Sequence, residues 1–87
     1  MKIGDLVRIL PSSFNDYREL YGNDDSPTEF LKEEGYYILI PTFIQVFTGE
    51  LCTVLKVGKV GELDWVRIMK NDGRTGWIRD RWLEVLT

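Results

Sequence analysis

The chain has 87 residues, a net charge of −3 and no histidine. This length suits one domain with one modest core. Because the chain has no histidine, it lacks the commonest general base and metal ligand, and it has no Ser-His or Cys-His nucleophile pair. The lone cysteine, Cys52, can form no internal disulfide or metal cluster, and no apolar run reaches the roughly 18 residues that span a bilayer. We therefore expect a cytoplasmic protein that is not an enzyme and binds no cofactor, metal or membrane.

The first part of the chain is expected to begin with a strand and to continue with two short helices. Strand character runs through MKIGDLVRIL (1–10), and a proline ends it. A helix is expected over FNDYRELYG (14–22), with Asn15 as its cap and Gly22 as its stop. A second helix is expected over 26–35, where SPTE fits a capping box with proline at the first helical position.

The rest of the chain is expected to form a series of short strands. These strands cover 36–40, 43–47, 51–57, 65–70 and 75–79, a glycine-punctuated loop covers 58–64, and a short bend with a last strand covers 80–86. Short strands at this spacing are typical of a small barrel or sandwich.

The turn after the strand 65–70 determines which side chains share a face. A two-residue loop would put Ile68 and Ile78 on opposite faces. A three-residue loop at 71–73 pairs Ile68 with Gly76 and gathers the aliphatic side chains on one face. We prefer this register, since Gly73 can take the left-handed conformation that the end of such a loop needs. The glycine is then explained without a phosphate, and no helix follows it as a phosphate loop requires.

The segment GELCTVLKVGKVGELDWVRIMKNDGRTGWIRDRWLEVL (49–86) resembles the C-terminal two-thirds of an SH3-like barrel. Gly49-Glu50 resembles the turn that starts the family's strand with an aliphatic run. Trp65 stands where the leading binding-site tryptophan of the family would be, and Trp82 replaces the groove tyrosine of its one-turn helix. The resemblance implies an SH3-like fold for this part of the chain.

Three features depart from the common pattern of that family. Arg79 replaces the proline before the one-turn helix, GDLVRILPSS lacks the aromatic-rich opening motif, and the segment after the first strand is unusually long. The proline-peptide groove therefore does not transfer intact. The layout MKxGDLV…DGRTGW…LEV is closer to small uncharacterised phage and bacterial proteins with SH3-like barrels, which generally carry no defined activity. We expect a mainly β fold: one SH3-like barrel domain over 1–87, with a long, partly helical insertion at about 11–48.

Tryptophan and arginine side chains are the best candidates for a contact surface. Trp65 and Trp77 share the non-aliphatic face of the expected hairpin, with Arg67 between them, and Arg79 and Trp82 follow closely. Exposed tryptophan beside arginine is typical of interface anchors, so these five residues are the predicted partner-binding site. In the alternative, the insertion folds over this face and buries the tryptophans.

The leading hypothesis is a non-catalytic protein-interaction module that binds an unidentified protein partner. The resemblance suggests a phage origin, in which case the protein acts in the host cytoplasm. The alternative is nucleic-acid binding, because Arg67, Arg74, Arg79 and Arg81 with interleaved aromatics suit a single strand. Residues 49–87 hold six acids beside seven bases, however, which favours a salt-bridged surface over a basic strip. The sequence leaves the oligomeric state open.

Overall fold

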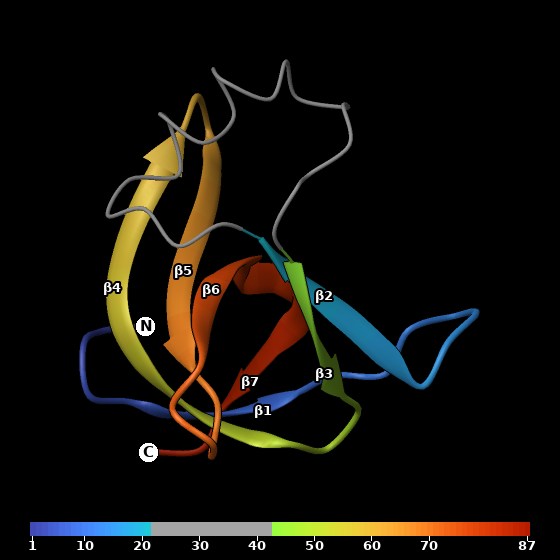
Figure 1. Ribbon diagram of the computed structural model, residues 1–87. Coiled ribbons are helices and arrows are strands. Elements are labelled where there is room, and N and C mark those ends of the chain that lie inside the picture. Colours follow the sequence, from blue (N-terminus) through green and yellow to red (C-terminus); the bar gives the residue numbers. More distant parts are fainter. Residues whose placement is uncertain (22–42) are drawn as a thin grey trace.

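The computed structural model describes residues 1–21 and 43–87, and this part of the chain is mainly β. Its strands are β1 (Leu6–Ile9), β2 (Tyr17–Tyr21), β3 (Phe43–Phe47), β4 (Leu51–Val60), β5 (Leu63–Met69), β6 (Thr75–Arg79) and β7 (Leu83–Val85), and a single 3-10 turn, η1 (Asp80–Trp82), precedes the last strand. The strands form one antiparallel sheet in the order β3-β2-β6-β5-β4-β1-β7 (Figure 1).

The long strand β4 curls the sheet into a barrel-like shape. Its first residues pair with β1 and its later residues pair with β5. The register shifts between Val54 and Lys56, which marks a bulge in the strand, and a bulge increases the local bend and twist. In Figure 1, β4 accordingly arches from beside β1 to the far end of β5.

Every strand contributes at least one side chain to a single apolar core. The buried members of this core are Val7, Ile9, Leu20, Val46, Cys52, Val54, Val66, Ile68, Ile78 and Leu83. Ile44 and the half-buried ring of Trp82 pack against them. Because successive side chains of a strand point to opposite faces, this core occupies the concave face of the curled sheet.

The β5–β6 hairpin has the predicted three-residue register. Ile68 lies opposite Gly76, and Val66 lies opposite Ile78. The Gly73 N–H donates to the Lys70 carbonyl at 3.0 Å, and Gly73 has a φ of 91°. The aliphatic side chains of the hairpin therefore share the core face, as the sequence pattern indicated.

The helix predicted over 14–22 is wrong, because Tyr17–Tyr21 forms strand β2. This strand pairs with β3 along its whole length and with β6 where Tyr21 meets Trp77. Leu20 is the one buried residue of β2. This segment could form a helix of barely two turns, which is marginal without packing, whereas the strand gains backbone hydrogen bonds from β3 and β6.

The loop predicted over 58–64 is also wrong. Strand β4 continues to Val60, β5 begins at Leu63, and these two residues are paired. Only Gly61 and Glu62 remain to make the turn, and Gly61 supplies a φ of 61°. Gly58 does not end the strand, because it pairs with Trp65 inside the ladder.

The predicted helical insertion is not seen in the described part of the chain, where its two ends form β2 and β3. The helix expected at 26–35 and the strand expected at 36–40 lie outside the described residues. Within residues 1–21 and 43–87, no helix has the length and apolarity that crossing a membrane requires.

Candidate functional site

The five predicted site residues divide between the interior and the surface. Trp77 is 0% exposed and Trp65 is 9% exposed, whereas Arg67, Arg79 and Trp82 are half-buried. The β5–β6 pairing puts Trp65 opposite Arg79 and Arg67 opposite Trp77, so these four side chains share one face of the hairpin. This face was predicted for Trp65, Arg67 and Trp77. The accessible surface on this face is therefore built without the side chain of Trp77.

A hollow of about 180 Å³ lies between β2 and the end of the β5–β6 hairpin. Seven of its lining residues are aromatic or charged: Tyr17, Arg18, Glu19, Tyr21, Trp65, Arg79 and Trp82. The hollow thus brings together three of the five predicted site residues. Arg67 and Trp77 do not line it.

The ring of Trp82 lies beneath two guanidinium groups. The Cζ atom of Arg18 lies 4.0 Å from the ring centroid, and the Cζ atom of Arg81 lies 4.6 Å from it. Arg18 is held in place because its Nε donates to the Leu10 carbonyl at 2.9 Å and its Nη2 donates to the Pro11 carbonyl. Burial, and then the positive charge of Arg81, lower the pKa of Arg18. This corner of the hollow is therefore aromatic and positively charged.

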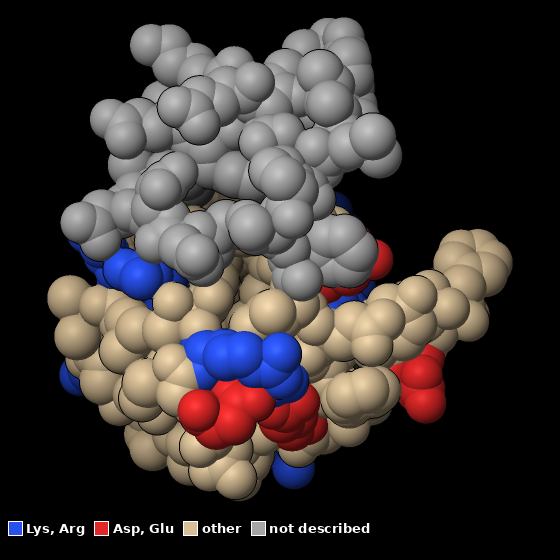
Figure 2. Space-filling view, in the orientation of Figure 1, with Lys and Arg blue, Asp and Glu red and all other residues tan. Residues whose placement is uncertain are grey.

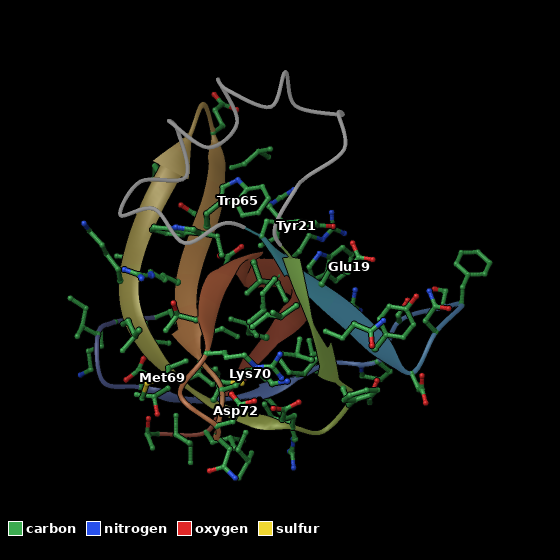
Figure 3. The ribbon with its side chains drawn as sticks, in the orientation of Figure 1. Glu19, Tyr21, Trp65, Met69, Lys70 and Asp72 are labelled. Atoms are coloured by element: carbon green, nitrogen blue, oxygen red, sulfur yellow. The ribbon has the colours of Figure 1, made fainter. Side chains whose placement is uncertain are left out.

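Trp65 forms the other wall together with Tyr21. The two rings meet edge to face, with centroids 6.4 Å apart and an interplanar angle of 67°. The Tyr21 hydroxyl donates to Glu19 Oε2 at 3.3 Å. Figure 3 shows Trp65, Tyr21 and Glu19 following one another from β5 across to β2. Burial, and then the Glu19 carboxylate, raise the pKa of Tyr21, so this hydroxyl stays a hydrogen-bond donor at neutral pH.

Two buried hydrogen-bond donors of the hollow-lining residues have no acceptor. They are the indole Nε1 of Trp65 and the guanidinium Nε of Arg79. The two residues are partners in the β5–β6 ladder, so the unpaired donors belong to neighbouring positions. A buried donor without an acceptor costs free energy, and native structures leave few of them.

The arginines predicted to form a basic strip are in different electrostatic surroundings. Arg74 pairs with Asp72 at 2.8 Å. None of the ion pairs found among the described residues includes Arg18, Arg79 or Arg81. On the face shown in Figure 2, basic atoms lie directly against acidic ones instead of forming a continuous strip. Three arginines that make no ion pair with another described residue therefore lie in the hollow or beside it.

The sequence interpretation missed Arg18 as a site residue. It assigned this residue to the short helix expected over 14–22. YRELY does not alternate between apolar and polar residues, so side-chain periodicity gives no signal of this strand. Such a strand carries its tyrosines along one edge of the hollow.

What the site offers chemically is aromatic surface, cationic charge and unused hydrogen-bond donors. Within residues 1–21 and 43–87, no group of three or more His, Cys, Asp or Glu side chains could hold a metal ion. Comparison of the chain with protein-family models, with curated proteins and with solved structures finds no match.

Proposed function

We propose that this protein is a non-catalytic interaction module, built on an SH3-like barrel, that binds a segment of another protein in the hollow between β2 and the β5–β6 hairpin. The observation that carries the proposal is the half-buried Trp82 ring, which lies under Arg18 and Arg81 and faces the same hollow as Trp65. Tryptophan and arginine are the residues most enriched among the dominant contacts of protein interfaces.

The sheet topology supports the SH3-like part of the proposal. The curled antiparallel sheet, the β5–β6 hairpin and the single turn of 3-10 helix before the last strand follow the layout that residues 49–86 resemble. Trp65 and Trp82, which stand at the family's binding positions, both line the hollow. The phage origin and the host cytoplasm rest on the sequence resemblance alone.

The size of the hollow favours a peptide side chain over a small-molecule substrate. Its volume is about 180 Å³, whereas pockets for small molecules typically hold roughly 300–1,000 Å³. A space of this size accepts one or two side chains, while the backbone of the partner stays outside. A short peptide segment can bind in this way, because only one or two of its side chains need to enter the hollow.

Nucleic acid is the less favoured occupant. Stacking of bases on aromatic rings drives binding to a single strand. Two guanidinium groups already lie over the Trp82 ring, and Trp65 is 9% exposed. Little aromatic face is left on which a base could stack.

Selection from a displayed library of randomised heptapeptides tests the proposal. The wild-type protein is expected to enrich a set of binders, and Arg79→Ala and Trp82→Ala are expected to lose them. Arg8→Ala is the matched control, because Arg8 pairs with Glu84 on the β1–β7 side of the sheet. Thermal unfolding establishes that each variant is folded.

Two results overturn the proposal. One is that the selected peptides bind the folded Arg79→Ala and Trp82→Ala variants as tightly as the wild type. The other is that no peptide is enriched. Binding of oligothymidine with an affinity that falls steeply as salt is raised would then favour a nucleic-acid-binding protein.

A further inference from the structure

The hollow has positive charge that the described part of the chain does not neutralise. Arg18 and Arg79 line it, and Arg81 lies over the Trp82 ring at its edge. Glu19 is the one acidic side chain among the described lining residues, and its Oε2 accepts the Tyr21 hydroxyl. None of the three arginines takes part in an ion pair between described residues. An anionic group would complement this site.

Two hydrogen-bond donors on residues that line the hollow lack an acceptor. The Nε1 of Trp65 and the Nε of Arg79 are buried without a partner, and they come from positions paired across β5 and β6. A carboxylate has two oxygens and can accept several hydrogen bonds at once. Hydrogen bonds from a guanidinium to a carboxylate are about twice as strong as neutral ones. A carboxylate that enters the hollow can therefore pair with the Arg79 guanidinium, and it is a suitable acceptor for the indole N–H of Trp65.

The position of Arg18 adds an independent reason for an anion. Its guanidinium donates to the carbonyls of Leu10 and Pro11, which hold it near Arg81. Burial, and then repulsion by Arg81, lower the pKa of Arg18. A nearby negative charge offsets this repulsion and stabilises both arginines.

We propose that the hollow selects an acidic segment of its protein partner, with an Asp or Glu carboxylate held by Arg79 and the indole N–H of Trp65 and a neighbouring apolar side chain at the edge of the Trp82 ring. This inference rests on the proposed function and specifies its ligand. The volume of about 180 Å³ suits one such side chain.

The first test is the composition of the selected heptapeptides. Peptides that compete for the same hollow are expected to carry Asp or Glu at one fixed position, next to an apolar residue. If acidic residues are no more frequent than in the starting library, this inference is overturned while the proposed function stands. If no peptide is enriched, both are overturned.

The second test uses one selected peptide and its Glu→Gln counterpart. The wild-type protein is expected to bind the acidic peptide at least about tenfold more tightly, the scale of a charge-assisted hydrogen bond. Arg79→Gln is expected to reduce this preference to less than twofold, and Arg8→Gln is expected to keep it. Equal binding of the two peptides by the wild type overturns the inference.

The third test needs no variant and therefore does not depend on folding of a mutant. In a nitrogen–proton correlation spectrum, the indole N–H resonance of Trp65 is expected to move downfield with the acidic peptide. The affinity for this peptide is expected to fall as salt is raised, and the affinity for the Gln peptide is expected to stay constant. An unmoved Trp65 resonance, or equal salt dependence for both peptides, overturns the proposal.

Discussion

The guanidinium of Arg18 lies 4.0 Å from the centre of the Trp82 ring, and this contact connects β2 to the 3-10 turn η1. The same side chain donates hydrogen bonds to the carbonyls of Leu10 and Pro11, in the segment that follows β1. Arg18 thus joins β2 both to the segment that follows β1 and to the distant turn η1. It is a structural residue of the hollow as well as a source of its charge.

Replacing Arg18 with alanine is expected to lower the free energy of unfolding by about 1–3 kcal/mol, because two hydrogen bonds and a cation–π contact are lost together. Urea denaturation at pH 7 measures this loss. Arg81→Ala is the matched control: it removes a cation over the same ring, but Arg81 is exposed. Its effect is expected to be smaller, since its removal also relieves repulsion of Arg18. Equal losses in the two variants would contradict this account.

Gly76 is required by the approach of β2 and not by a left-handed backbone. A Cβ added at Gly76 would lie 2.6 Å from the Leu20 Cβ and 3.3 Å from the Leu20 carbonyl carbon. Gly76→Ala is therefore expected to cost about 1–3 kcal/mol of stability, the scale of an overpacked core. Urea denaturation gives this value.

A double-mutant cycle tests the cause of that cost. The Leu20→Ala substitution keeps the Cβ that collides, so the cost of Gly76→Ala is expected to be the same in both backgrounds. Full relief of the cost by Leu20→Ala would place the conflict further along the leucine side chain instead.

Local chemistry predicted much of the second half of the fold. The three-residue turn with Gly73, the pairing of Ile68 with Gly76 and the shared face of Trp65 and Arg67 all follow from side-chain alternation and from one glycine. Such features are encoded within about fifteen residues of chain. The hairpin register could therefore be derived without knowledge of the rest of the sheet.

Contacts between residues that are far apart in the sequence determine the features of the fold and of the site that the sequence could not predict. Strand β2 has one buried residue, Leu20, and exists through its pairing with β3 and β6. The pattern placed Trp77 on the correct face of the hairpin, but its 0% exposure depends on distant parts of the fold. For the same reason Arg18, which reaches Trp82 across the sequence, was not identified as part of the candidate site.

Lys70 is a buried cation that joins the end of β5 to β3. Its side chain is 8% exposed, its Nζ donates to the Gln45 carbonyl at 2.7 Å, and it lies 3.8 Å from Glu50 Oε2. Lys70→Met is expected to lower the free energy of unfolding by about 1–3 kcal/mol, because a carbonyl and a carboxylate lose their partner. The exposed Lys56 on β4 provides the control, and Lys56→Met is expected to change urea denaturation little. Similar losses in both variants would rule out a specific role for the buried contact.

The buried thiol of Cys52 makes stability depend on pH in the alkaline range. Burial, and then the charge of Glu50, raise its pKa from 9.0 to about 12. Between these values the unfolded chain releases the thiol proton while the folded chain keeps it, so the folded state loses stability as pH rises. The contribution of Cys52 is constant below pH 9 and decreases by about 1.4 kcal/mol per pH unit inside the window.

Urea denaturation of the wild type and of Cys52→Ala at pH 8 and pH 10.5 isolates this contribution. The alanine variant is less stable at pH 8, because it loses core packing next to residues such as Val7 and Val54. Its deficit is expected to shrink by about 2 kcal/mol at pH 10.5, since only the wild type carries the thiol that ionises on unfolding. A deficit that is the same at both pH values would show that the thiol titrates alike in the folded and unfolded chains, and that burial does not hold its proton.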